Sequence, residues 1–140
     1  VGVSTAWGSF ARPTNPVLRD VHEYILVFCK EDWRLPGREE GSGIQNQDFV
    51  DWTRSIWQIP TESASRVGHP APFPEELPRR LILLYTSRGD TVLDPFLGSG
   101  TTAVAAARLG RRYVGYDVSP EYCELARRRL GAIQGAFWGD

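Results

Sequence analysis

The chain has 140 residues, enough for about one domain but few for an enzyme that must bind two substrates. Hydrophobic residues make up 41% and charged residues 24%, ordinary globular values that argue against a disordered or a membrane class. The net charge of -1 excludes a global positive field that would attract nucleic acid. We interpret the basic run Arg127-Arg128-Arg129 as a solvated helix face, because charge runs are weak evidence for a DNA contact.

The N-terminus and the cysteines give no sign of secretion. The first residues lack the basic-then-apolar pattern of a signal peptide and no apolar run is long enough to span a membrane, so we expect a cytoplasmic location without a membrane partner. Cys29 and Cys123 have no metal-ligand spacing around them, which predicts free, buried thiols and neither a metal site nor a disulfide. The chain starts at Val1 and contains no Met, which fits removal of an initiator Met and an upstream truncation equally well.

The first half of the chain predicts one buried strand between loops. Residues 1–20 are rich in Gly, Ser, Thr and Pro and indicate a loop. The stretch "VHEYILVFCK", residues 21–30, is β-branched and aromatic with almost no polar break, which is typical of a strand buried on both faces. Residues 31–48 return to Gly, charged and amide residues and predict a connector. Residues 48–60 fit a short helix and a strand edge equally well.

The second half predicts a repeated strand-helix unit. After a Pro-rich lead-in, residues 75–87 have acids suited to a first helical turn and then apolar residues at helical spacing, and Pro78 is tolerable only in that first turn. The elements that follow are a strand at 91–94, a glycine loop at 95–100, a helix at 101–109 capped by Gly110, a strand at 112–117 and a helix at 119–130 with Ser119 as N-cap. This order predicts an α/β fold with a doubly wound, mostly parallel sheet.

The glycine loop fits two kinds of site. Gly98-x-Gly100-x-x-Ala103 matches the dinucleotide fingerprint, and Asp117 ends the second strand, where an acid can accept hydrogen bonds from two ribose hydroxyls. A tight structural turn with a solvent-facing Asp is the alternative. Asp94, at the carboxyl end of the first strand, argues against a dinucleotide because a carboxylate would repel a pyrophosphate.

S-adenosylmethionine fits this loop better than a dinucleotide does. Its ammonium and sulfonium groups favour a carboxylate such as Asp94 and an aromatic face such as Phe96, and its ribose favours the second acid. Gly98 and Gly100 would let backbone amides approach the methionine carboxylate, and the helix that starts at Thr101 would add its positive end.

Four stretches together carry a family resemblance. "DPFLGSGTT" with "GYDVSPEYCELARRRL", preceded by "HPAPFPEELPRRLI" and "RDVHEYILVFCK", closely resembles the DNA amino-methyltransferases, which methylate the exocyclic nitrogen of cytosine or adenine. The resemblance spans most of residues 12–131 and follows the permuted order of that family, in which the cofactor half comes last. It implies a Rossmann-like S-adenosylmethionine-dependent methyltransferase fold that is incomplete here, with residues 1–66 as the remnant of the catalytic half and 67–140 as the cofactor half. It also implies DNA as partner and a role in restriction-modification.

The resemblance assigns cofactor contacts residue by residue. It implies that the methionine side of the cofactor is lined by Asp94, Pro95, Phe96, Gly98, Ser99, Gly100 and Thr101. Asp117 is expected at the ribose, with Val118 and Ser119 near the adenine. His69 and Phe73 match the segment that in the family closes over the cofactor, and a rigid loop that merely orients the next helix is the alternative for them.

The family's catalytic tetrapeptide is missing, so the catalytic residues are unknown. In the family an Asp, Asn or Ser, then Pro-Pro, then an aromatic hold the flipped base, whereas "NPVL" at residues 15–18 lacks the second proline and the aromatic. We therefore expect the catalytic residues N-terminal to Val1 and a chain that binds S-adenosylmethionine but transfers methyl poorly or not at all. A non-catalytic complementing or DNA-binding module of a split methyltransferase, acting with a second chain or as a homo-oligomer, and a dinucleotide-binding oxidoreductase fragment are the alternatives.

Overall fold

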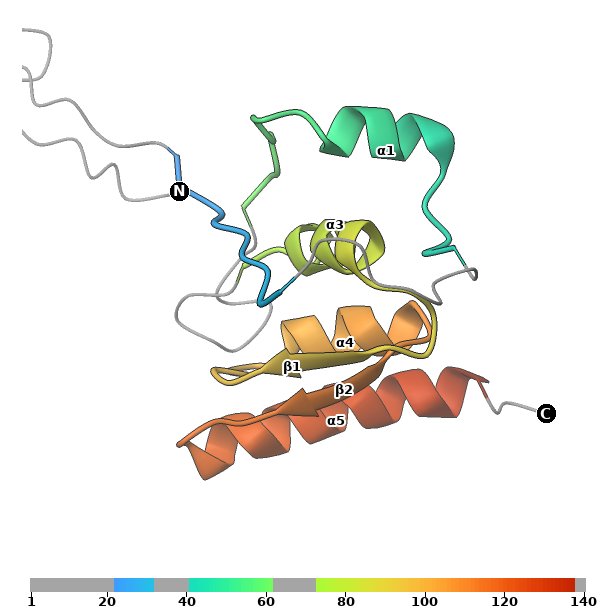
Figure 1. Ribbon diagram of the computed structural model, residues 1–140. Coiled ribbons are helices and arrows are strands. Elements are labelled where there is room, and N and C mark those ends of the chain that lie inside the picture. Colours follow the sequence, from blue (N-terminus) through green and yellow to red (C-terminus); the bar gives the residue numbers. More distant parts are fainter. Residues whose placement is uncertain (1–21, 32–40, 62–72, 138–140) are drawn as a thin grey trace, which may run out of the picture. The chain divides into compact units, whose positions relative to one another are not determined.

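The computed structural model describes residues 22–31, 41–61 and 73–137. The chain divides into two compact units, Val1–Leu35 and Pro36–Asp140. All the helices and strands of the described residues lie in the second unit (Figure 1). In chain order they are α1 (Asn46–Trp52), α3 (Glu76–Tyr85), β1 (Thr91–Asp94), α4 (Thr101–Arg108), β2 (Arg112–Gly115) and α5 (Pro120–Phe137).

A two-stranded parallel sheet forms the centre of the second unit. β1 and β2 pair in the register that sets Thr91 opposite Arg112 and Asp94 opposite Gly115, and α4 is the crossover between them. The predicted α/β architecture with parallel strands is therefore confirmed for this part of the chain. Because parallel strands run in the same direction, the residues that follow β1 and β2 emerge at one edge of the sheet.

Helix α4 lies at the centre of the core. It contacts both strands as well as α3 and α5, and the alanines on its inner face are almost completely buried. Ala105 and Ala106 pack with Ile82 of α3, and Val92 and Tyr113 of the sheet lie against this cluster. Small side chains on α4 allow the helix to lie close to its neighbours. The close packing of α4 fixes the position of the loop that leads into it.

An arginine-tryptophan cluster joins α1 to α3. The guanidinium groups of Arg79 and Arg80 lie 4.7 and 5.4 Å from the ring of Trp52, which is buried, and Trp57 donates its indole N–H to the Trp52 carbonyl at 2.9 Å. Glu76 accepts from both arginines at 2.7 Å. Burial raises the pKa of Glu76, but the hydrogen bonds from the two arginines outweigh it, and the pKa lies below its usual value.

A buried arginine ties the start of β2 to two distant segments. Arg111 donates from Nε to Thr86 Oγ1 at 3.0 Å, from Nη1 to the Leu109 carbonyl at 2.7 Å, and from Nη2 to the carbonyls of Ser42 and Thr86 at 2.7 and 2.8 Å. Burial, together with the positive charge of Arg88, lowers the pKa of Arg111. The guanidinium remains charged and holds the chain near residue 42 against the βα core.

The predicted helices and strands of the second half lie where the sequence patterns indicate, with shifted ends. Pro78 lies in the first turn of α3, and Gly110 follows α4 with a φ of 72°, as a helix-terminating glycine does. Ser119 accepts from the amide of Tyr122 at 3.3 Å, which confirms it as the N-cap of α5. β2 ends two residues earlier than predicted, whereas α5 continues to Phe137, because Ala, Ile and Gln after residue 130 sustain a helix.

The predicted strand at residues 21–30 is wrong for the described part, residues 22–31. This segment has no regular secondary structure, and Tyr24 and Phe28 are 83% and 84% exposed. A strand needs a neighbour to satisfy its backbone hydrogen bonds, and the described residues contain strands only at β1 and β2, which pair with each other. Cys29 is likewise exposed rather than buried, whereas Cys123 is half-buried, and both thiols are free.

The open choice at residues 48–60 resolves as a helix for its first part, since α1 runs over Asn46–Trp52. The predicted connector over 31–48 therefore ends at residue 45, three residues sooner. Over the three described ranges, no helix combines the length and the apolar character needed to cross a bilayer.

Candidate functional site

The glycine loop leaves β1 through a tight turn. Asp94 accepts the amide of Phe96 at 3.0 Å on its Oδ1, and the amide of Gly100 donates to the Leu97 carbonyl at 2.9 Å. Gly98 and Gly100 have φ values of 52° and 84°, in the left-handed region that residues with a Cβ rarely adopt. The two glycines are thus required by the backbone path between the strand and α4.

Two glycines also allow close approaches around the loop. A Cβ on Gly100 would lie 2.7 Å from Cβ of Ala126 in α5, and a Cβ on Gly115 would lie 2.7 Å from the side chain of Leu97. The amide of Leu97 donates to the carbonyl of Tyr116 at 2.8 Å. The loop is therefore packed between the end of β2 and the middle of α5 rather than extended into solvent.

Asp117 connects the loop to the start of α5. Its Oδ2 accepts from the amide of Gly98 at 2.7 Å and its Oδ1 from the amide of Ser119 at 2.8 Å. A carboxylate has about four lone-pair sites, so a carboxylate in this position suits hydroxyl donors as well as amides. Asp117 is therefore not the solvent-facing Asp of the structural alternative, because its carboxylate accepts hydrogen bonds that hold the loop.

Asp94 is the last residue of the neighbouring strand, β1. Within the ranges that the structure describes, its carboxylate makes a single hydrogen bond, from the Phe96 amide. Since β1 and β2 pair in parallel with Asp94 opposite Gly115, Asp94 and Asp117 both belong to the carboxyl edge of the sheet. An edge with two carboxylates and a glycine loop suits a ligand that combines a cationic group with hydroxyl groups.

Arg129 is a site residue that sequence reasoning missed. Its Nη1 donates to the Ser99 carbonyl at 2.7 Å, to Ser99 Oγ at 3.0 Å and to Thr101 Oγ1 at 3.2 Å. The solvated face predicted for this arginine run is therefore wrong at Arg129, whereas Arg127 and Arg128 are exposed. The contact joins residues 30 positions apart, so no local pattern in the sequence indicates it.

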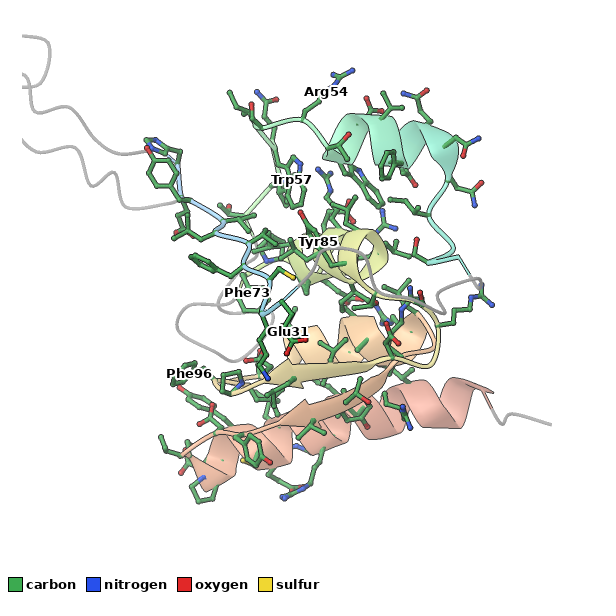
Figure 2. All side chains as sticks on the ribbon, in the orientation of Figure 1. Glu31, Arg54, Trp57, Phe73, Tyr85 and Phe96 are labelled. Atoms are coloured by element: carbon green, nitrogen blue, oxygen red, sulfur yellow. The ribbon has the colours of Figure 1, made fainter. Side chains whose placement is uncertain are left out.

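Two apolar site residues, Phe96 and Val118, are exposed in the segments that follow β1 and β2. Phe96 is 86% exposed and lies at the carboxyl end of β1 (Figure 2), and Val118 is fully exposed. Phe73 is partly exposed just before α3, and His69 lies outside the described residues. Exposed aromatic and aliphatic groups beside two carboxylates give this edge an apolar surface for a ligand ring.

The remaining predicted positions follow the same loop. Pro95 is exposed at the beginning of the loop, and Ser119 is half-buried at the start of α5. In the described ranges no three His, Cys, Asp or Glu side chains gather as metal ligands would. The structure thus brings together the loop, Asp117 and Ser119 by hydrogen bonds, with Asp94 and Phe96 at the same edge.

Comparison with known proteins connects this site to a family. The sequence profile of the N6/N4 methyltransferases, described as DNA methylase, matches residues 5–128. The type II methyltransferase M2.DpnII of Streptococcus pneumoniae is 46% identical over 123 residues, 88% of this chain and 41% of the relative. The type II methyltransferase M.MthZI of Methanothermobacter thermautotrophicus is 36% identical over 135 residues, 88% of this chain and 38% of the relative. The chain thus spans about two fifths of the length of these curated relatives.

A solved structure supports the fold. The protein TTHA0409 of Thermus thermophilus, solved in complex with S-adenosyl-L-methionine, is 40% identical and has a TM-score of 0.60 over 71% of this chain and 39% of its own. The βα core described above is therefore part of a Rossmann-like methyltransferase fold. Since the profile match covers most of the chain and includes both acids and the glycine loop, the chain belongs to the DNA methylase family.

Proposed function

We propose that this chain is the S-adenosylmethionine-binding part of a DNA amino-methyltransferase, which transfers methyl to an exocyclic amine of cytosine or adenine. One observation carries the proposal: Asp94 and Asp117 stand at the same edge of a parallel sheet, on either side of a glycine loop that Asp117 holds through the Gly98 amide. This arrangement offers a carboxylate for the ammonium of the cofactor and a second for its ribose diol.

The chain's residues have separate roles in this proposal. Asp94 pairs with the ammonium group, Asp117 accepts from the ribose hydroxyls, and Phe96 and Val118 contact the sulfonium and adenine regions. The cofactor supplies an electrophilic methyl group, and the protein's task is to orient it, since the transfer is an in-line displacement that depends on position more than on acid-base chemistry. His69 and Phe73 would close the site from the segment before α3.

Methyl transfer itself needs residues that bind the target base. The family's tetrapeptide for this task has no match in the sequence, so the 140-residue chain alone is proposed to be inactive on DNA. The two relatives, which are more than twice as long, are named type II methyltransferases. Binding of the target base is therefore not assigned to residues of this chain.

Calorimetric titration of the purified chain with S-adenosylmethionine tests the proposal. We expect saturable binding that is weakened at least tenfold in Asp117→Asn, which keeps the size of the side chain but replaces the acceptor oxygen that a ribose diol needs. Asp51→Asn in α1, which changes the charge equally at an exposed ion pair, is the control and should bind as the unaltered chain does. Absence of binding by the unaltered chain, or equal binding by all three proteins, refutes the proposal. NADH should neither bind nor compete, which separates this function from the oxidoreductase alternative.

A second candidate function is a non-catalytic module that completes another chain. Leu93 and Tyr116 are 60% and 62% exposed, and Val114 beside them is exposed too, so one face of the β1-β2 sheet carries uncovered apolar side chains. A partner that carries the catalytic tetrapeptide would cover such a surface. Sedimentation over a hundredfold range of protein concentration tests this candidate, since a strictly monomeric chain that fails to bind any such partner argues against it.

A further inference from the structure

Arg129 of α5 contacts the glycine loop through hydrogen bonds. Three oxygen atoms of the loop and of the first turn of α4 lie within 3.2 Å of its Nη1, and they belong to Ser99 and Thr101. Both residues are buried, with exposed fractions of 5% and 4%. A guanidinium that donates to several oxygens of a buried turn fixes that turn more firmly than backbone hydrogen bonds alone.

The direction of these hydrogen bonds determines what the loop presents. A guanidinium can only donate, so the hydroxyl oxygens of Ser99 and Thr101 act as acceptors towards Arg129. The two hydroxyls are 3.4 Å apart and at most one donates to the other. At least one hydroxyl hydrogen therefore remains for a third acceptor. The Ser99 carbonyl, which would repel an anion, is bound to a cation instead.

We propose that Arg129 is a positioning residue, which holds the turn from Gly98 to Thr101 and makes it selective for the carboxylate at the methionine end of the cofactor. The inference rests on the proposed function for the identity of the ligand. It assigns to Arg129 a task that its neighbours in the basic run do not share, because Arg127 pairs with Glu124 at 3.6 Å and Arg128 is exposed.

The experiment compares two probes that differ at one end. S-adenosylhomocysteine carries the amino acid group, whereas 5′-methylthioadenosine has the same adenosine and thioether but lacks it. Each is titrated calorimetrically into the unaltered 140-residue chain, Arg129→Gln, Arg129→Lys and the control Arg128→Gln, which loses the same charge one residue away. Melting temperatures and circular dichroism of all four proteins establish that they are folded.

We expect Arg129→Gln to weaken binding of S-adenosylhomocysteine about tenfold and of 5′-methylthioadenosine less than about threefold, because the turn that Arg129 no longer holds loses about one hydrogen bond to the carboxylate end of the probe. Arg129→Lys keeps the charge and should recover part of the difference, and Arg128→Gln should change neither affinity. A purely structural role would weaken both probes equally. Equal weakening of both affinities, or no weakening of either, overturns the proposal. If Arg129→Gln fails to fold, the proposal is overturned when Arg129→Lys shows no difference between the two probes.

Hydrogen exchange separates this inference from the proposed function. Amide exchange of Gly98 to Thr101 is measured on the chain without ligand, so it reports the anchoring even if the unaltered chain binds neither probe. We expect about tenfold faster exchange in Arg129→Gln and unchanged exchange in Arg128→Gln, because a lost hydrogen-bond anchor lowers the local opening free energy. Failure of the unaltered chain to bind refutes the proposed function, whereas unchanged exchange in Arg129→Gln refutes the role of Arg129.

Discussion

Replacing Gly100 by Ala tests the packing of the glycine loop. The residue has a φ of 84°, and an added Cβ would lie 2.7 Å from Cβ and 3.0 Å from Cα of Ala126, which are distances that neighbouring carbon atoms do not adopt. The backbone of α5 would therefore have to move away from α4. Two separate costs follow, one from the backbone conformation and one from the steric contact.

The two costs of Gly100→Ala have different physical origins and can be estimated separately. A left-handed φ costs a residue with a Cβ about 1–2 kcal/mol. Overpacking a well-packed contact by one methyl group adds about 1–3 kcal/mol. Gly100→Ala should therefore lower the free energy of unfolding by about 2–5 kcal/mol, which is a large part of the 5–15 kcal/mol, roughly, that holds a typical domain folded.

Urea denaturation measured with Gly110→Ala as control separates the two costs. Gly110 has a similar φ of 72°, but a Cβ there meets nothing within 4 Å, so only the backbone cost of about 1–2 kcal/mol applies. Ala126→Gly in the Gly100→Ala background should recover part of the excess, beyond the cost of about 1 kcal/mol that a glycine brings to a helix. Equal destabilisation by Gly100→Ala and Gly110→Ala would refute the reasoning, because it would mean that α5 does not press on the loop.

Three further predictions concern charged groups and thiols. Arg111→Ala should lower the free energy of unfolding by about 1–3 kcal/mol, since buried carbonyls lose their donor, whereas Arg112→Ala, at an exposed position, should change it by less than about 0.5 kcal/mol in the same denaturation assay. Glu76 has a folded-state pKa below its ordinary value of 4.5, so its ion pairs stabilise the protein above pH 4.5 and the stabilisation disappears as the pH falls through the folded-state pKa. Thermal melts should accordingly show a deficit for Glu76→Gln at neutral pH that shrinks at pH 3, and an equal deficit at both pH values contradicts the assignment. Cys29 should react with a thiol reagent faster than Cys123, so Cys29→Ser should abolish the fast phase.

The site was predictable from sequence wherever local chemistry determines it. Gly98 and Gly100 have positive φ values, and Ser119 caps α5, because each requirement involves residues only a few positions apart. The hydrogen bond from Gly98 to Asp117 spans 19 residues and depends on the loop folding back over β2, which no periodicity reveals. The contact of Arg129 with the loop spans 30 residues and has no local signal either.

The predicted strand at residues 21–30 failed on a different physical ground. An apolar run shows that a segment is suited to burial but does not supply the strand that pairs with it, and strand pairing is a non-local interaction. The short strands β1 and β2 were recognisable because a glycine loop and capped helices bounded them on both sides. Loop-type residues on both sides of the run at 21–30 limit its length but do not indicate which strand would pair with it.

The hydrogen bond from Arg111 to the Ser42 carbonyl sets a limit on how the protein can be cut for expression. The bond joins residues 69 positions apart, and a recombinant fragment of residues 67–140 would retain the arginine but lose that acceptor, along with the whole of α1. A fragment of residues 36–140 keeps both and follows the division of the chain into compact units. Split-protein reconstitution should therefore place its breakpoint before residue 36, where separating the pieces leaves this buried cation with all its partners.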